Sequence, residues 1–330
     1  MRAAWYERQG PADEVLEVGE MPDPVAGPGE VRVRVHASGV NPSDVKRRAV
    51  GRWPMDHPRV IPNTDGAGVV DQVGEGVSEG WLGKRIWLYN GQRLGRAFGT
   101  AADFIALDAD LITELPEHLS FAEGVCLGVP AMTAHRCVFA DGPVTGLTVM
   151  VTGGAGAVGH YAIQLAKWDG ATVITTVSGD EKARHAKAAG ADHVVNYRTE
   201  DVAERVMQIT AGAGVDRIVE VDFGGNLAVT LKTLKLNGSI AAYASAGDEQ
   251  PKLPFYALMS RNALIRLVTL NNMPIEARRQ AQRDVTRWTH EAKGNHPIAA
   301  RFPLDRIAEA HRTVESGAKI GQVVVDIVPE

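Results

Sequence analysis

Short apolar runs alternate with amphipathic helical segments through the second half of the chain. The runs at 147–151 and 171–177 are apolar, as expected for strands buried in a parallel sheet. Between them, a helical pattern is ended by Gly170. The alternation predicts a doubly wound parallel sheet. Its further strands are expected at 192–197, 215–221, 238–244 and 263–272, and its further helices at 180–189, 199–211 and 226–236.

The first 110 residues follow a period of two instead. Residues 31–40 alternate apolar and polar positions after a turn-forming segment at 24–30, which indicates a half-buried strand. Short strands interrupted by glycine and proline predict a partly open β-barrel. The segment 41–62, which contains four prolines, is expected to form helix turns and loop. The other strands are expected at 66–77, 84–89 and 104–115.

The remaining segments complete a two-domain prediction. Residues 121–142 have the pattern of helical pieces, with Ser120 as a cap and Pro130 as a break. The last strand, expected at 323–328, has no sheet of its own and is expected to join the N-terminal barrel. The fold class is thus α/β, with a barrel-like domain at 1–125 and 272–330 and a nucleotide-binding domain at 126–271. After residue 272 we expect helix 274–293, strand 297–303, helix 304–316 and strand 323–328.

A glycine-rich turn joins the first strand of the parallel sheet to the following helix. Gly154, Gly156 and Gly159 have the spacing G-x-G-x-x-G. In a strand–turn–helix context these glycines allow a tight turn, close approach of a pyrophosphate and close packing of the helix. The helix N-terminus then faces the phosphates. We therefore predict a dinucleotide site, with cofactor contacts from Gly154, Ala155, Gly156, Ala157, Val158 and Gly159.

The strand at 171–177 lacks the acidic residue that usually binds the ribose 2′-hydroxyl of NAD. It ends in Thr176, Val177, Ser178 and Gly179. Asp180 and Glu181 follow and could cap the next helix. The missing acid favours NADP(H) over NAD(H). The cations and the tyrosine that could surround a 2′-phosphate are Lys182, Arg184, Tyr197 and Arg198, although solvated helix positions would explain Lys182 and Arg184 equally simply.

Composition narrows the class of protein. The chain has 330 residues, of which 45% are hydrophobic and 23% charged, as in ordinary globular enzymes. A net charge of −5 without a dense basic block argues against a nucleic-acid partner. Cys126 and Cys137 form neither a metal spacing nor a disulfide framework. The sequence shows no signal peptide and no run of transmembrane length, so we expect a cytoplasmic protein without membrane contact.

Several collinear motifs resemble one family. They are GEVRVRVHASGVNPSD (29–44), DGAGVVDQVGEGV (65–77), LGVPAMTAHRCV (127–138), VMVTGGAGAVGHYAIQLAK (149–167), GADHVVNY (190–197) and GQVVVDIV (321–328). Together they resemble the medium-chain dehydrogenase/reductase superfamily, and within it the zinc-independent NADPH:quinone oxidoreductase (zeta-crystallin-like) branch. The resemblance implies a GroES-like catalytic domain and a Rossmann domain, with NADPH bound in the cleft between them.

The resemblance also bears on metal chemistry. Zinc alcohol dehydrogenases of this superfamily carry their catalytic ligands at positions that match Asn41, Thr64 and Val129 here. None of these side chains is a thiolate or an imidazole, and a catalytic zinc needs three protein ligands. We therefore expect no metal. Hydride transfer would then depend on positioning and on hydrogen-bond donors aimed at the oxygen that gains charge.

By resemblance, Asn41 and Thr133 are expected near the nicotinamide as catalytic and cofactor-binding residues. Asn41 could instead be a turn residue in Val-Asn-Pro, and Thr133 a helix cap. Asp44 could orient Asn41 or pair with Arg47 or Arg48. The resemblance further implies cofactor contacts from Ser178, Lys182, Tyr197 and Tyr243, where Tyr243 could equally be a core aromatic.

Two positions depart from the family pattern. Lys46 stands where quinone reductases commonly have a tyrosine that faces the substrate, and Asn63 stands where glycine is usual. Lys46, Arg47 and Arg48 could favour an anionic substrate or form solvated surface. The substrate class is therefore less securely implied than the cofactor.

The resemblance implies a reductase that transfers hydride from NADPH to a quinone or another conjugated carbonyl. The nearest alternative is an enoyl or alkenal reductase of the same fold, which reduces a C=C bond. A non-enzymatic NADPH-binding or RNA-binding relative is the alternative from another class. Family members commonly pair the last strand of the nucleotide domain across a two-fold axis, so the apolar segment 264–270 predicts a homodimer.

Overall fold

The computed structural model describes residues 1–51 and 53–328. The described residues of 1–129 and 296–328 form one compact unit, and residues 130–295 form another. Each unit corresponds to one of the two hydrophobic patterns in the sequence. The first is built from strands with alternating apolar and polar residues, and the second from strand–helix repeats.

The first unit is organised around a sheet with the order β14-β15-β3-β4-β5-β7, in which β6 also pairs with β3. Its longest strand, β3, owes its position to strict alternation: Val31, Val33 and Val35 are fully buried, whereas Arg34 is exposed. The predicted partly open barrel is confirmed. The strands are β1 (Arg2–Trp5), β2 (Glu17–Glu20), β3 (Glu30–Val40), β4 (Asp65–Val73), β5 (Arg85–Leu88), β6 (Phe104–Asp108), β7 (Ile112–Glu114), β14 (Ile298–Pro303) and β15 (Gln322–Asp326).

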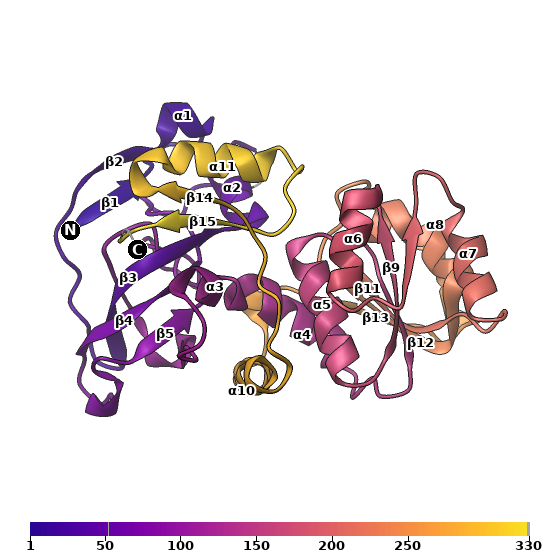
Figure 1. Ribbon diagram of the computed structural model, residues 1–330. Helices are drawn as coiled ribbons and strands as arrows, with labels where there is room; N and C mark the ends of the chain where they lie inside the picture. The colour runs from indigo at the N-terminus through magenta and orange to yellow at the C-terminus, as the bar shows by residue number, and fades with distance from the viewer. Residues whose placement is uncertain (52, 329–330) are drawn as a thin grey trace. The chain divides into compact units, whose positions relative to one another are not determined.

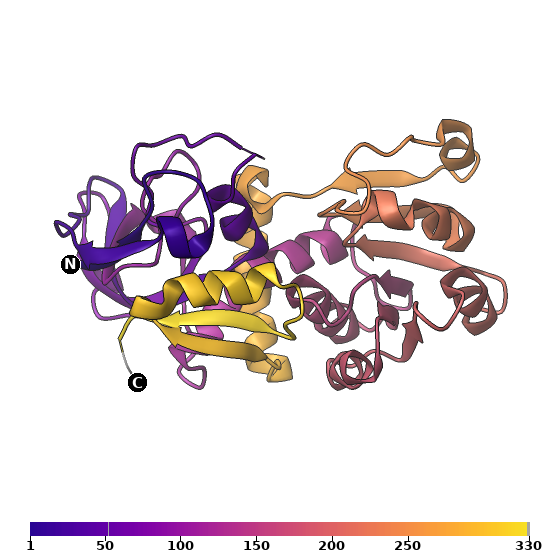
Figure 2. The same ribbon diagram turned by 90° about the horizontal axis from the view of Figure 1, so that it is seen from above.

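The closing strand returns to the N-terminal barrel, as its lack of a sheet of its own predicted. β15 pairs antiparallel with β3, with Val323 opposite Val40, and parallel with β14. Figures 1 and 2 show β14 and β15 side by side with α11 along them. The helices of this unit are α1 (Ala12–Val15), α2 (Pro42–Arg48), α3 (Phe121–Val125) and α11 (Ile307–Glu315).

The second unit contains a six-stranded sheet in the order β10-β9-β8-β11-β12-β13, and all its pairs are parallel. This is the doubly wound sheet that the sequence predicted. The strand order runs outward from β8 in one direction and from β11 in the other, so the switch point lies between these two strands. Such folds bind ligands at the switch point. The strands are β8 (Thr148–Val151), β9 (Thr172–Val177), β10 (His193–Asn196), β11 (Val215–Glu220), β12 (Leu234–Ala242) and β13 (Leu264–Leu267).

Helices cover both faces of this sheet. Figure 1 shows α5 and α6 on one face and α7 and α8 on the other, as right-handed crossovers in both directions require. The helices are α4 (Met132–Phe139), α5 (Ala157–Trp168), α6 (Asp180–Ala188), α7 (Val202–Ile209), α8 (Phe223–Thr233), α9 (Phe255–Met259) and α10 (Ile275–Ala292).

The boundaries of the units differ from the sequence-based ones at 125 and 271. α10, which the sequence analysis assigned to the catalytic domain, belongs to the second unit because it packs on α4 and α5. Ala281, Val285 and Trp288 form its buried face. In the described part of the chain no helix is both long and apolar enough to cross a membrane.

Candidate functional site

The glycine turn after β8 gives each of its three motif glycines a different environment. A Cβ on Gly154 would lie 2.0 Å from Thr175 Oγ1, and one on Gly159 would lie 2.4 Å from the Gly153 carbonyl oxygen. Gly156 is exposed, and a Cβ there would have the Gly153 oxygen as its only neighbour, at 3.2 Å. Gly154 and Gly159 therefore permit packing inside the protein, whereas Gly156 leaves open space on its outer side.

The N-terminus of α5 fits an anionic group. Gly156 is its N-cap, with no side-chain cap, and the first turn has no acidic residue. Ala155 is buried, while Ala157 and Val158 are half-buried beside the open Gly156. Uncapped N–H groups at a helix N-terminus form a phosphate site. The turn therefore suits the pyrophosphate of a dinucleotide.

The predicted 2′-phosphate residues gather at the carboxyl ends of two neighbouring strands. β9 and β10 pair with Val177 opposite Asn196, and the Tyr197 amide donates to the Val177 carbonyl at 3.1 Å. Ser178 therefore lies beside Tyr197, and Lys182 follows in the first turn of α6. Tyr197 is 53% exposed.

The two remaining predicted residues of this unit occupy different settings. Tyr243 directly follows β12, and burial raises the pKa of its hydroxyl well above the usual value. Its backbone N–H donates to the Glu220 carbonyl. Thr133 lies buried inside α4, whose N-cap is Ala131. Thr133 is therefore not a helix cap, which removes the alternative that the sequence left open.

A buried carboxyl at the switch point was missed by the sequence analysis. Glu220 ends β11, and its Oε1 accepts hydrogen bonds from Thr152 Oγ1 (2.8 Å), the Asp222 amide (2.6 Å) and Asn226 Nδ2 (2.8 Å). Burial raises the pKa of Glu220. The carboxyl ties the end of β8 to the end of β11, where the dinucleotide is expected. Its only sequence signal was an acidic residue directly after the apolar pair Ile218 and Val219.

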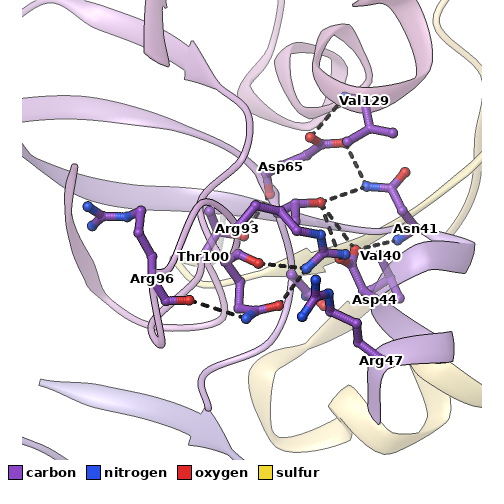
Figure 3. Close-up of polar contacts among 12 residues, drawn as sticks. Val40, Asn41, Asp44, Arg47, Asp65, Arg93, Arg96, Thr100 and Val129 are labelled. Atoms are coloured by element: carbon purple, nitrogen blue, oxygen red, sulfur yellow. Dashed lines mark hydrogen bonds and ion pairs between the residues drawn. The ribbon is translucent and has the colours of Figure 1, made fainter. Parts of the chain in front are cut away.

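In the first unit, Asn41 lies at the junction of β3 and α2, where it is 2% exposed (Figure 3). Its Nδ2 donates to Asp65 Oδ2 at 2.7 Å and, more weakly, to Thr64 Oγ1 at 3.4 Å. Gln322 Nε2 donates to Asn41 Oδ1 at 3.2 Å. The position is thus the N-cap of α2, rather than the turn residue considered from the Val-Asn-Pro pattern, and it is part of a buried polar network.

Asp44 pairs with neither of the arginines that the sequence analysis considered. Its Oδ1 accepts from Arg93 Nη2 at 2.9 Å, and its Oδ2 accepts from the Asn41 backbone N–H at 2.9 Å. Arg47 pairs with Asp56 at 3.0 Å, and the buried Arg48 pairs with Glu315. The orienting role proposed for Asp44 is therefore directed at the Asn41 backbone. Its cation comes from a loop 49 residues away.

Asp65 is the second buried carboxyl of this network (Figure 3). Its Oδ1 accepts from the Val129 N–H at 2.9 Å. Burial raises the pKa of Asp65 well above its usual value, and the nearby Asp44 raises it further, whereas hydrogen bonds from Asn41 and Val129 act in the opposite direction. Asp44 and Asp65 thus share one buried polar network with a single neighbouring guanidinium, that of Arg93.

Of the two departures from the family pattern, Asn63 has a structural explanation. It adopts a φ of 73°, in the left-handed region that glycine enters without cost and asparagine better than most residues. Its Nδ2 donates to Ser38 Oγ at 3.0 Å, and its Oδ1 lies 3.1 Å from His311 Nε2. Asn63 therefore satisfies the backbone requirement of glycine and adds two buried contacts.

Two family models match the chain. Residues 27–117 match the alcohol dehydrogenase GroES-like domain, and residues 157–287 match the zinc-binding dehydrogenase family. The chain is 28% identical to the quinone oxidoreductase of Rattus norvegicus, over 97% of this chain and 95% of the relative. It is 30% identical to a zinc-type alcohol dehydrogenase-like protein of Schizosaccharomyces pombe, over 91% of each. The chain belongs to the medium-chain dehydrogenase/reductase superfamily, in its quinone oxidoreductase branch.

A solved member of this superfamily has the same fold over the full length. The structure of mycobacterial Rv1454c complexed with NADPH has a TM-score of 0.86 at 27% identity, and the match covers 99% of this chain and 100% of that one. Both the GroES-like unit and the Rossmann unit are therefore those of a medium-chain dehydrogenase/reductase.

The residues present do not fit the catalytic zinc of the superfamily's alcohol dehydrogenases. At the three matching positions, Asn41 and Thr64 use their polar groups in hydrogen bonds, and Val129 offers only its backbone. Within residues 1–51 and 53–328, no group of three or more His, Cys, Asp or Glu could hold a metal ion. Cys126 and Cys137 are both buried and form no disulfide.

Proposed function

We propose that this chain is an NADPH-dependent, zinc-independent reductase that delivers hydride to a quinone. The observation that carries the proposal is the set of groups at the carboxyl ends of β8 and β9. There the open, uncapped N-terminus of α5 lies beside β9, which ends at Val177 without a carboxylate and is followed by Ser178 and Lys182. This combination favours a dinucleotide with a 2′-phosphate.

The proposed chemistry assigns binding and orientation to the chain. When bound, NADPH supplies the hydride. The N–H groups at the start of α5 hold the pyrophosphate, and Lys182 and Tyr197 hold the 2′-phosphate. Thr133 and Asn41 are proposed to flank the nicotinamide. A quinone carbonyl accepts hydride without a Lewis acid, so the lack of a zinc ligand set is compatible with this acceptor, and solvent supplies the proton.

Titration of the purified protein with NADPH and NADH, followed by nicotinamide fluorescence, tests the cofactor. We expect tight NADPH binding and NADH binding at least about tenfold weaker, because only NADPH carries the phosphate that Lys182 can contact. Equal affinities would contradict the role of this cluster. Binding of neither cofactor would contradict the proposed activity altogether.

Steady-state oxidation of NADPH then tests the acceptor. We expect turnover with 1,4-benzoquinone at a higher kcat/KM than with an unsubstituted enone, because the quinone needs no polarising group. The reverse order would identify a C=C reductase instead. Each acceptor is measured with the same NADPH concentration, so that the comparison depends on the acceptor alone.

We also propose that the chain forms a homodimer through β13. This strand is the last of its sheet and, in the described chain, pairs with β12 only. Leu264 and Leu267 on it are exposed. An exposed apolar edge strand favours pairing with a second copy across a two-fold axis. Light scattering at micromolar concentration tests this assembly, and a stable monomer would contradict it.

A further inference from the structure

Asn41 is held by partners on three separate segments, two of which contact its side chain and one its backbone. Asp65 at the start of β4 accepts from its Nδ2 at 2.7 Å, and Gln322 at the start of β15 donates to its Oδ1 at 3.2 Å. Asp44 in α2 accepts from its backbone N–H at 2.9 Å. Both ends of the carboxamide are thus defined by the surrounding chain, which gives the side chain one orientation.

Asp65 determines that orientation. Its Oδ2 faces Asn41 and its Oδ1 accepts from the Val129 N–H at 2.9 Å, so each carboxylate oxygen has its own donor. The 128–129 backbone can approach because residue 128 is glycine: a Cβ there would lie 2.3 Å from Asp65 Oδ1. The carboxylate therefore joins β3, β4 and the turn before α4, at positions that match the zinc ligands of the alcohol dehydrogenases.

This arrangement fixes the polarity of Asn41. Both Asp65 oxygens face N–H donors, Oδ1 the Val129 amide and Oδ2 the Asn41 NH₂, so the NH₂ end of the carboxamide points toward Asp65. The second hydrogen of that NH₂ has Thr64 Oγ1 as its partner, at 3.4 Å. The carbonyl Oδ1 has two lone pairs, and Gln322 uses one of them. The free hydrogen-bonding capacity of Asn41 is therefore that of an acceptor.

We infer that Asp65 is a positioning residue that turns the Asn41 carboxamide so that Asn41 meets a bound ligand as a hydrogen-bond acceptor. The ligand group would be an N–H or O–H donor, such as a carboxamide or a sugar hydroxyl. The inference rests on the proposed function, because Asn41 is proposed there to flank the nicotinamide. It differs from the expectation that uncharged donors at this site stabilise the developing oxyanion.

Exchanging the two side chains tests this assignment. Asp65→Asn alone places one carbonyl oxygen opposite two donors, and Asn41→Asp alone places two carboxylates together. In the double variant Asn41→Asp/Asp65→Asn, the amide at position 65 donates to the carboxylate at position 41 and still accepts from Val129. The carboxylate at position 41 still accepts from Gln322, but it has no donor. Asp71→Asn, on the same strand, is the control for loss of a paired carboxylate that does not contact Asn41, because Asp71 pairs with Arg32 at 2.9 Å.

We expect each single variant to lower kcat by at least about tenfold, with the NADPH dissociation constant changed less than about threefold. The double variant should regain kcat to within about threefold of wild type. A double variant as slow as the single variants would mean that the Asn41 NH₂ acts as a donor, and would overturn the inference. Wild-type turnover in Asp65→Asn would overturn it as well.

The melting temperature of each cofactor-free variant provides a readout that does not depend on turnover. Both single variants should have lower melting temperatures than the wild type and Asp71→Asn. The double variant should regain a melting temperature close to that of the wild type. No loss in Asp65→Asn would overturn the inference. If no tested acceptor supported NADPH oxidation by the wild-type protein, the proposed function alone would be contradicted. The melting temperatures would still decide whether Asp65 holds Asn41.

Discussion

Two glycines three residues apart have separable effects. Gly156→Ala should leave the melting temperature nearly unchanged but weaken NADPH binding by about tenfold or more, because the new methyl group occupies the outer side of the turn. Gly159→Ala should instead destabilise the protein by about 2 kcal/mol, because its Cβ would collide with backbone. Urea unfolding and NADPH fluorescence on both variants test the separation. Equal losses of stability would contradict it.

The charge of Lys182, in the first turn of α6 after β9, can be tested by substitution. Lys182→Ala should weaken NADPH binding about tenfold, which is about 1.4 kcal/mol, and leave NADH binding unchanged. Lys187→Ala removes the same charge from an exposed position on the same helix and is the control. If both variants bind NADPH like wild type, Lys182 is a solvated surface residue and the 2′-phosphate assignment is wrong.

Local patterns identified residues whose role depends on their chain neighbours. The Ser120 cap, for example, is confirmed, with Ser120 and Glu123 forming a capping box. The Asp44–Arg93 pair could not be predicted, because 49 residues separate its partners and nothing in the sequence brings that loop back to α2. For the same reason no sequence signal indicated that Glu220 and Asp65 would bond to side chains 68 and 24 residues away. The roles of Asn41, Lys182 and Tyr197 in binding stay predictions.

At the scale of elements, the edge strand β13 has the clearest consequence. Its Leu267 is 75% exposed, and the adjacent α9 exposes Phe255, Tyr256 and Met259. Leu267→Asp should convert the proposed dimer to a monomer at micromolar concentration, because two carboxylates would be buried together in the interface. Val25→Asp, which changes an equally exposed residue of the other unit, should leave the assembly unchanged. Multi-angle light scattering on both variants decides between these outcomes.

The order of elements was predictable because strand and helix periods differ so clearly on the two sides of residue 120. The assignment of α10 to a unit was not. An amphipathic helix shows that it buries one face, but its sequence does not show against which partner. Ala281, Val285 and Trp288 would suit either core. The rings of Trp288 and Tyr161 of α5 pack edge to face, with their centroids 5.8 Å apart. Only the folded chain reveals this contact.

For the whole molecule, acid sensitivity follows from His311. Burial, followed by the charge of Arg48, lowers the pKa of this histidine from 6.5 to about 3. Between those values the unfolded chain binds a proton that the folded chain does not. The contribution of His311 to the free energy of unfolding is therefore constant above pH 6.5. It falls as the pH decreases below 6.5, by up to about 1.4 kcal/mol per pH unit.

Urea unfolding between pH 7.5 and pH 5 measures this contribution. His311→Gln should reduce the loss of stability over that range by about 2 kcal/mol, because glutamine does not titrate. His193→Gln, at an exposed position, is the control and should follow wild type. A wild-type slope retained in His311→Gln would show that other groups cause the acid sensitivity.

The pairing of β15 with β3 has a consequence for how the protein is made. During synthesis, residues 130–295 emerge as one uninterrupted segment and can form their parallel sheet while the ribosome is still translating. The first unit must wait, because β15, which pairs with β3, follows the whole second unit in the chain. Until then residues 37–40 of β3 lack their partner strand on that edge, which is the period in which a nascent chain would most need a chaperone.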